Sequence, residues 1–335
     1  MKEAEYYVSR NKEVTCLLCP HACTLSNGQR GKCQVRRNVE GKLISESYGN
    51  VSALHVDPIE KKPLYHFHPG SKSFSISTNG CVLSCLNCQN WQISQRGIDI
   101  KPDEYLHPEG VVKMAVDTDC KSIAYTYTDP VVFYEYMIDM ARVAQTHGLK
   151  NVLISSGYLN TKPLKELIPF IDAANIDLKC FDDQLYRKLN GATLKPVLQA
   201  LKNLKQSNVW LEITNLIIPG WTDDMEMIRK MCSWLASEGF NDVPLHFNRF
   251  TPAYKLNSLH ITPESTLQEA KMIAKENGLK YVYIGNVYGH DYTSTFCFKC
   301  GELLIKRFKG VSLIGLSENG VCVNCNETIV GVWNE

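Results

Sequence analysis

Short apolar segments alternate with longer amphipathic segments through the middle of the chain. Six short runs rich in apolar or β-branched residues, each bounded by polar or turn residues, predict β-strands. They span residues 74–77, 122–127, 151–155, 175–178, 209–217 and 244–250. Apolar residues recur at helical spacing between them, as in 131–147, where Gly148 follows as a helix cap. Thr222 is the predicted N-cap of another helix, which runs to about Glu238.

Repeated strand–helix units predict an α/β fold. Six such units in a row indicate parallel strands joined by right-handed crossovers. The periodicity fits both a barrel and an open doubly wound sheet, and it does not choose between them. In either architecture the functional residues are expected in the loops at the carboxyl ends of the strands.

Composition and charge narrow the class of protein. Hydrophobic residues make up 44% of the 335 residues and charged residues 21%, as in folded globular chains. Lysine and arginine (36) balance aspartate and glutamate (35), so no global basic field points to nucleic acid as a main partner. No run approaches the roughly 18–20 apolar residues of a membrane span, and the N-terminus lacks a signal-peptide pattern. We therefore expect a cytoplasmic protein without a membrane partner.

Cysteine is the outlying residue type, with fourteen copies, most of them clustered. In a reducing compartment, clustered thiols indicate metal ligands rather than disulfides. Eleven cysteines fall into three groups: Cys16, Cys19, Cys23 and Cys33; Cys81, Cys85 and Cys88; Cys297, Cys300, Cys322 and Cys325. The groups divide the chain into a Cys-rich extension (1–70), the α/β domain (71–290) and a C-terminal module (291–335). The solitary Cys120, Cys180 and Cys232 are predicted to be small buried hydrophobic residues.

The middle group, Cys81, Cys85 and Cys88, follows the first predicted strand at C-x3-C-x2-C spacing. Three thiolates within eight residues suit a cubane iron–sulfur cluster, because a tight loop must wrap one small cube. A fourth thiolate is missing, so one iron would stay open to bind and activate a ligand. The alternative is a zinc site completed by a remote histidine, although zinc pairs usually have C-x2-C or C-x4-C spacing.

This motif in this position closely resembles the radical SAM superfamily, whose C-x3-C-x2-C loop follows the first strand of a partial (β/α)6 TIM-type barrel. The resemblance implies that Cys81, Cys85 and Cys88 hold a [4Fe–4S] cluster whose open iron is chelated by S-adenosylmethionine. It also implies that an electron from the cluster cleaves this cosubstrate to methionine and a 5′-deoxyadenosyl radical, which abstracts hydrogen from a substrate.

Within that superfamily the chain looks like the relatives of the pyruvate formate-lyase activating enzyme. Residues 177–179 resemble the group's Asp-Leu-Lys motif. Residues 125–130 occupy the place of its Gly-Gly-Glu stretch but differ from it in sequence. In the family the backbone of that stretch contacts the methionyl amine, and a backbone contact can survive the replacement of side chains. Residues 155–157 stand where these enzymes often have Asp-Thr-Asn-Gly, but Ile154 replaces the acid, which puts a cation site there in doubt. The resemblance assigns cosubstrate binding to Thr128, Asp129, Ser155, Asp177, Lys179 and His246.

Three residues near the predicted site carry further expectations. His246 is assigned to the cosubstrate by resemblance, and a core histidine bonded to a backbone carbonyl is an equal alternative. Asn215 and Arg249 are expected to face the pocket, where they could bind an anionic group of the substrate.

Several sequence segments resemble those of the radical SAM members of the AmmeMemoRadiSam system. They lie at residues 57–70, 88–91, 216–220, 244–252 and 281–286, and with the cysteine groups they cover nearly the whole chain. This resemblance implies Memo-like and AMMECR-like proteins as functional partners.

The two four-cysteine groups predict further metal sites. Cys297-x2-Cys300 and Cys322-x2-Cys325, separated by 21 residues, are typical of a structural zinc ribbon, and an auxiliary iron–sulfur cluster is the alternative. For Cys16, Cys19, Cys23 and Cys33, zinc and an iron–sulfur cluster fit equally. The basic run 306–309 is predicted to be a solvated edge of the ribbon.

The sequence therefore predicts a radical SAM enzyme that modifies a protein or another macromolecule. Such an enzyme needs a low-potential electron donor, a flavodoxin or a ferredoxin. A glycyl-radical-enzyme activase is one alternative. A non-catalytic zinc-ribbon module that binds protein or RNA is the other.

Overall fold

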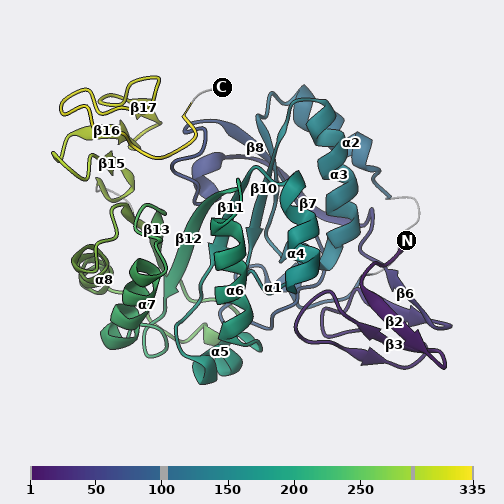
Figure 1. Ribbon diagram of the computed structural model, residues 1–335. Coiled ribbons are helices and arrows are strands. Elements are labelled where there is room, and N and C mark those ends of the chain that lie inside the picture. Colours follow the sequence, from purple (N-terminus) through teal and green to yellow (C-terminus); the bar gives the residue numbers. More distant parts are fainter. Residues whose placement is uncertain (1, 99–104, 288–290, 334–335) are drawn as a thin grey trace.

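The centre of the molecule is an eight-stranded sheet (Figure 1). The computed structural model describes residues 2–98, 105–287 and 291–333. The strands of the sheet are β7 (Val51–Pro58), β8 (Lys72–Thr78), β9 (Ser122–Tyr125), β10 (Lys150–Ser155), β11 (Ala173–Asp177), β12 (Trp210–Ile217), β13 (Leu245–Arg249) and β14 (Val282–Gly285). The six predicted strands correspond to β8–β13, and β14 is a seventh parallel strand that the sequence analysis did not identify.

The order of the strands distinguishes the two predicted architectures. The strands lie side by side in the order of the sequence, from β7 to β14. A doubly wound sheet reverses its order at a switch point, and this sheet does not. Strands β8 to β14 are parallel, and β7 pairs antiparallel with β8. Among the described residues no pairing joins β14 to β7, so the sheet winds in one direction and keeps two edges.

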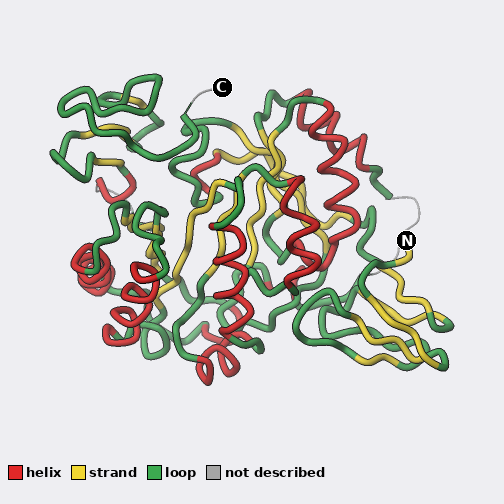
Figure 2. Tube along the Cα trace, viewed as in Figure 1, coloured by secondary structure: helices red, strands yellow, loops and turns green. Residues whose placement is uncertain are grey.

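Helices follow the strands and pack along the sheet (Figure 2). They are α1 (Trp91–Ser94), α2 (Pro108–Asp117), α3 (Tyr134–Thr146), α4 (Thr161–Leu167), α5 (Asp183–Asn190), α6 (Leu194–Lys205), α7 (Met225–Ser237) and α8 (Glu264–Glu276). Short 3-10 turns are η1 (Ile59–Lys61), η3 (Pro130–Phe133), η4 (Ile168–Phe170), η5 (Tyr254–Leu256) and η6 (Asp291–Thr293). Each of β8 to β13 is thus followed by helix, as six β–α units require. In the described ranges none of the helices combines the length and apolarity needed to cross a lipid bilayer.

The predicted N-cap of α7 is wrong by two residues. The Asp224 carboxylate, not Thr222, accepts the backbone N–H of Glu226 (2.9 Å) and of Met227 (3.4 Å). The Thr222 hydroxyl instead accepts the N–H of Ile218 and donates to the carbonyl of Leu216, both at 2.8 Å. It closes the turn after β12, and the charged Asp224 is left to satisfy the helix N-terminus.

The Cys-rich extension forms two small antiparallel sheets (Figure 1, purple). One contains β1 (Lys2–Glu3), β6 (Lys42–Ser45) and β5 (Arg36–Val39), and the other β2 (Tyr7–Arg10), β3 (Glu13–Cys16) and β4 (Thr24–Leu25). The last part of the predicted extension (1–70) contributes to the central sheet, because β7 pairs with β8 from Val51 onward.

The C-terminal module is a three-stranded antiparallel sheet (Figure 1, yellow) of β15 (Thr295–Phe296), β16 (Leu303–Lys306) and β17 (Ser312–Leu313). The predicted boundary at 290 borders residues 288–290, which lie outside the described residues. The prediction of a solvated edge is wrong for Arg307, whose side chain is 4% exposed. Its guanidinium donates to the Thr293 carbonyl (2.9 Å), the Thr295 hydroxyl (2.7 Å) and the Tyr65 carbonyl, so it joins the module to the segment before β8.

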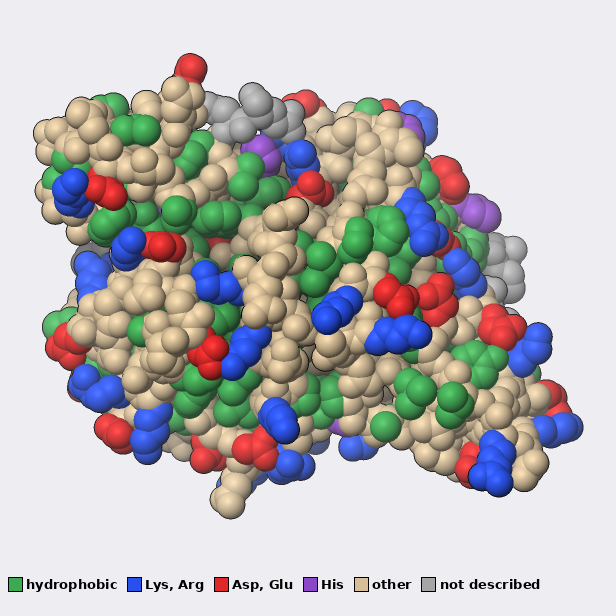
Figure 3. Space-filling view, viewed as in Figure 1, with side chains coloured by type: hydrophobic (Ala, Val, Ile, Leu, Met, Phe, Trp, Pro, Cys, Tyr) green, Lys and Arg blue, Asp and Glu red, His purple; other side chains and the backbone are tan. Residues whose placement is uncertain are grey.

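The visible surface carries no large patch of one charge. In Figure 3, basic and acidic side chains are interspersed over the face shown. The three solitary cysteines are buried, as predicted. The chemistry of the molecule is therefore concentrated in its grouped cysteines and in the cavities beside them.

Candidate functional site

One cavity of about 260 Å³ lies at the carboxyl ends of β8 to β11. This is the edge where parallel α/β folds place their functional loops. The lining combines two thiols with polar loop residues and a charged pair: Lys61, Lys62, Cys81, Leu83, Cys85, Asn90, Thr126, Tyr127, Thr128, Asp129, Ile154, Ser155, Ser156, Asp177 and Lys179. The structure thus brings together residues from five separate segments of the chain, the four loops after β8 to β11 and the turn at η1.

The cysteine loop after β8 begins at Gly80, whose φ of +90° an L side chain rarely adopts. A Cβ atom there would meet the Cys33 carbonyl oxygen at 2.4 Å, so only glycine fits. Of the three loop cysteines, Cys81 and Cys85 line the cavity, and Cys88, which follows them in the same loop, is partly buried.

Each of the three loop sulfurs has a hydrogen-bonding neighbour, and at Cys81 and Cys85 this neighbour donates to the sulfur. The Cys81 Sγ accepts the N–H of Leu83 (3.5 Å) and the Cys85 Sγ accepts the Asn190 amide (3.2 Å), while the Cys88 Sγ lies 3.1 Å from the Ser94 hydroxyl. Burial raises the pKa of the Cys81 and Cys85 thiols. A bound cation would reverse that effect, because thiolates are the form that metals bind. Donors aimed at sulfur and a missing fourth thiol fit a cluster with one open iron.

Asp129 fixes the loop after β9. Its carboxylate accepts the N–H of Val131 (3.2 Å), the hydroxyl of Ser155 (3.0 Å) and the N–H and hydroxyl of Ser156, the N–H at 2.9 Å. Burial raises the pKa of this carboxyl against these four donors. The Thr128 hydroxyl donates to the Thr78 carbonyl (3.0 Å). The side chains of Asp129 and Thr128 are both hydrogen-bonded to other protein groups. They therefore hold the backbone of this loop at the cavity.

Lys179 places a positive charge beside the cysteine loop. Its ammonium donates to Asp177 at 2.9 Å. Burial opposes the charge, but Asp177 and the Cys85 thiol raise the pKa of Lys179 above its usual range. The side chain therefore stays protonated and can bind an anionic group next to the sulfurs.

Four of the predicted site residues do not line this cavity: Cys88, His246, Asn215 and Arg249. His246 is buried below it, with its Nε2 2.6 Å from the Glu212 carboxylate and its ring against those of Tyr65 and Tyr283. Its partner is thus a carboxylate rather than the backbone carbonyl considered as the alternative. The Asn215 amide donates to the Leu178 carbonyl (2.7 Å), and the Arg249 Nε donates to the Thr262 carbonyl (3.0 Å).

Sequence reasoning gave no role to Lys62, which lines the cavity although it is only 2% exposed. Its ammonium lies 2.6 Å from Asp57 and 4.7 Å from the centre of the Tyr127 ring. Burial lowers the pKa of Lys62, and Asp57 raises it in part. The sequence carries no signal for this burial, because the adjacent Lys61 pairs with the same carboxylate and is 63% exposed.

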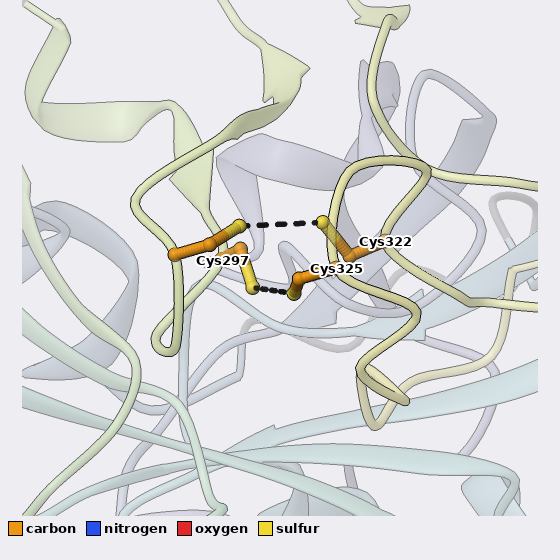
Figure 4. Close-up of side chains that lie close together, drawn as sticks. Cys297, Cys322 and Cys325 are labelled. Atoms are coloured by element: carbon orange, nitrogen blue, oxygen red, sulfur yellow. Dashed lines mark hydrogen bonds between the residues drawn. The ribbon is translucent and has the colours of Figure 1, made fainter.

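The C-terminal cysteines form a compact group (Figure 4). The four sulfurs of Cys297, Cys300, Cys322 and Cys325 lie within 4.8 Å of one another, with Cys297 3.6 Å from Cys325 and Cys300 3.7 Å from Cys322. Zinc–thiolate bonds of about 2.3 Å give a tetrahedron with edges of about 3.8 Å. The backbone N–H of Glu302 lowers the pKa of Cys300 to about 6. Four thiols at these separations could hold one metal ion.

The N-terminal cysteines also converge. Cys16, Cys19, Cys23 and Cys33 line a second, enclosed cavity together with His21 and Arg36. Val82, from the loop that carries Cys81, forms part of the same wall.

Comparisons with known proteins agree with this geometry. The sequence model of the radical SAM superfamily matches residues 75–232, which contain the three loop cysteines and the Asp177–Lys179 pair. The chain is 43% identical to an uncharacterized protein of Methanocaldococcus jannaschii over 98% of its own length and 99% of that protein. It is 20% identical to the pyruvate formate-lyase 1-activating enzyme of Escherichia coli, over 61% of this chain and 89% of that enzyme.

Solved structures show the same fold. Streptococcus suis SuiB bound to the precursor peptide SuiA superposes with a TM-score of 0.52 at 12% identity, covering 69% of this chain and 52% of SuiB. The cysteine loop, the one-way parallel sheet and these matches lead to one conclusion. Residues 75–232 of the chain belong to the radical SAM superfamily.

Proposed function

We propose that this protein cleaves S-adenosylmethionine reductively and uses the 5′-deoxyadenosyl radical to abstract hydrogen from a macromolecular substrate. A [4Fe–4S] cluster held by Cys81, Cys85 and Cys88 would supply the electron and an open iron. The observation that carries the proposal is the single cavity in which two of these thiols meet the loop 126–129 and the pair Asp177–Lys179.

The residues around the cavity have distinct tasks in this proposal. The Lys179 ammonium binds and orients an anionic group, and Asp177 holds that ammonium in place at 2.9 Å. Asp129 and Thr128 hold the backbone of 126–129 against the cavity, where carbonyl groups can accept from the methionyl amine. Ser155 supports this loop through its bond to Asp129.

The size of the cavity supports a large substrate. Its volume of about 260 Å³ lies just below the range for small-molecule sites, which begins near about 300 Å³. The cosubstrate alone would fill it. A substrate must then reach the radical from the mouth of the cavity, as one exposed side chain of a macromolecule can.

The finer identity is also a proposal. The AmmeMemoRadiSam resemblance extends over nearly the whole chain, and Memo-like and AMMECR-like proteins are the partners it implies. A flavodoxin or a ferredoxin is the proposed electron donor. At the C-terminal cysteines we favour structural zinc, because sulfur–sulfur distances of 3.6 and 3.7 Å suit one tetrahedral ion.

A glycyl-radical-enzyme activase is the second candidate. It is favoured by the relatives named as pyruvate formate-lyase activating enzymes, but they match only 61–63% of this chain in the Escherichia coli and Staphylococcus epidermidis examples. The two terminal cysteine modules would have no task in minimal activase chemistry. A purely non-catalytic binding module would not require the charged cavity beside Cys81 and Cys85.

The test is anaerobic reconstitution with iron and sulfide, followed by dithionite and S-adenosylmethionine. We expect 5′-deoxyadenosine to form, and to increase when a macromolecular fraction of a lysate is added. Replacing Cys81, Cys85 and Cys88 together with alanine should abolish it, while Cys232→Ala, which removes a buried thiol of α7, should not. If no 5′-deoxyadenosine forms on a protein loaded with its loop cluster, the proposal fails.

A further inference from the structure

Four thiols outside the candidate active site face one enclosed space. Cys16 ends β3, Cys19 and Cys23 lie in the turn before β4, and Cys33 precedes β5. All four line the same cavity. A Cβ atom on Gly31 would lie 3.6 Å from the Cys23 sulfur and 3.7 Å from the Cys33 sulfur, so a glycine keeps this wall close to both.

A buried guanidinium, paired with a buried carboxylate, borders the same cavity. Arg36 lines it and is only 2% exposed. Its guanidinium donates to the Glu5 carbonyl (3.2 Å) and to Glu135, but its Nε has no partner among the described residues. An unpaired buried N–H is costly, whereas thiolates and inorganic sulfides are acceptors for it. Glu135 balances the charge of Arg36, so the guanidinium offers one unpaired N–H beside the thiols.

The spacing of the thiols distinguishes a cluster from a single ion. Among the described residues, only the C-terminal cysteines bring three or more ligand sulfurs within 4.8 Å of one another. The N-terminal four do not, and neither do Cys81, Cys85 and Cys88. One zinc ion draws its sulfurs to a single tetrahedral edge of about 3.8 Å. A cubane binds each thiolate to a different iron, so its ligands stand further apart.

The N-terminal cavity adjoins the loop of the active site. The His21 Nε2 lies 2.7 Å from the Val82 carbonyl, and Val82 itself lines the cavity. On the other side of Cys81, the Gly80 backbone packs against the Cys33 carbonyl so closely that a Cβ atom would be 2.4 Å away. Both neighbours of Cys81 thus touch the N-terminal site.

We propose that Cys16, Cys19, Cys23 and Cys33 hold a second iron–sulfur cluster that delivers electrons to the cluster of the cysteine loop. The electron-transfer role of this cluster rests on the proposed function, because it needs the loop cluster as the electron acceptor. A reduced flavodoxin or ferredoxin gives one electron to the N-terminal cluster. That cluster passes it to the loop cluster and returns to its oxidised state, so the donor is oxidised by one electron and the loop cluster is reduced by one.

The metal assignment is tested by iron, sulfide and zinc analysis with electron paramagnetic resonance after anaerobic reconstitution. The variant with Cys81, Cys85 and Cys88 replaced by alanine should keep about half of the wild-type iron and an iron–sulfur signal that S-adenosylmethionine does not change. Adding Cys19→Ala and Cys23→Ala should remove this iron and leave zinc. Retention of zinc but no iron by the first variant would overturn the proposal, whether or not wild type makes 5′-deoxyadenosine.

The electron path is tested by comparing two reductants in the Cys19→Ala/Cys23→Ala variant. With dithionite, a small reductant that can reach the loop cluster directly, formation of 5′-deoxyadenosine should stay within about twofold of wild type. With reduced flavodoxin it should fall at least tenfold. Equal losses with both reductants would mark a structural site and overturn the relay, as would no loss with either. Cys120→Ala, which removes a buried thiol outside all three groups, is the matched control.

Discussion

At the scale of single residues, the positive charge of Lys179 is the feature by which the cavity is expected to bind an anionic group. Lys179→Met removes the cation beside Cys85 but keeps the length of the side chain. We expect cleavage of S-adenosylmethionine to fall at least tenfold while the iron content stays unchanged, because the lysine is not a cluster ligand. The control is Lys195→Met on the exposed side of α6. Equal activity of both variants would show that Lys179 has no role in binding the cosubstrate.

Gly80 connects the backbone of the cysteine loop to the N-terminal extension. Gly80→Ala would combine a φ of +90° with contacts of 2.4 Å to the Cys33 carbonyl and 2.6 Å to Val35. Gly220→Ala is the matched control, since its φ of +71° is also positive but its Cβ would meet nothing within 4 Å. We expect both to destabilise the protein, Gly80→Ala by about 1–3 kcal/mol more. Urea unfolding measures the difference. Equal losses of unfolding free energy in the two variants would show that the N-terminal extension shifts to accommodate the added methyl group.

At the scale of elements, α7 tests how helix ends are stabilised. Asp224→Ala removes the acceptor of two backbone N–H groups and should lower the free energy of unfolding by about 1 kcal/mol. Asp224→Asn should retain most of that stability, because asparagine caps nearly as well. Urea unfolding of the two variants checks this, and a large loss with asparagine would mean that charge, not capping geometry, stabilises the helix.

The same helix shows what local sequence can and cannot predict. Periodicity identified strands β8 to β13 and placed α7, because their apolar faces repeat in the sequence. It chose Thr222 as the N-cap because threonine and aspartate both cap helices, and only the contact of Thr222 with Leu216 and Ile218 decides. The strand β14 was missed because Val282–Gly285 is short, and its pairing with β13 is seen only in the folded structure.

The candidate site was likewise predictable from the sequence only in part. Cys81, Cys85, Asp177 and Lys179 belong to local motifs, and they do meet in one cavity. His246 was assigned to the cosubstrate by resemblance, but it is bonded to Glu212, an acid on another strand. Arg307 was taken for a solvated residue because its partners, such as Tyr65, are remote in the chain. Long-range pairing of buried polar groups is not encoded in any short window.

At the scale of the whole molecule, His66 ties three distant segments together. Its Nδ1 lies 2.7 Å from the Val330 carbonyl and its Nε2 lies 2.6 Å from the Tyr283 hydroxyl. The adjacent backbone continues the connection, since Val332 donates to the His66 carbonyl and His68 donates to the Val332 carbonyl. The segment before β8, strand β14 and the C-terminal tail therefore share one buried imidazole.

Burial makes this connection sensitive to pH. Desolvation lowers the pKa of His66 from 6.5 to about 4. Between these values the unfolded chain binds a proton that the folded protein excludes, so stability is full above pH 6.5 and declines as the pH falls toward 4. Each pKa unit corresponds to about 1.4 kcal/mol, and the full decline is therefore on the order of 3 kcal/mol.

The His66→Gln variant tests this argument because glutamine keeps hydrogen-bonding capacity but does not titrate near neutral pH. Its urea unfolding midpoint should be lower than that of wild type at pH 7.5 and should change less between pH 6.5 and 4.5. His147→Gln at the exposed end of α3 should follow the wild-type curve. If wild type and His66→Gln lose stability in parallel over this range, other groups cause the acid sensitivity. If only wild type shows the decline, one imidazole links the docking of the C-terminal tail to pH.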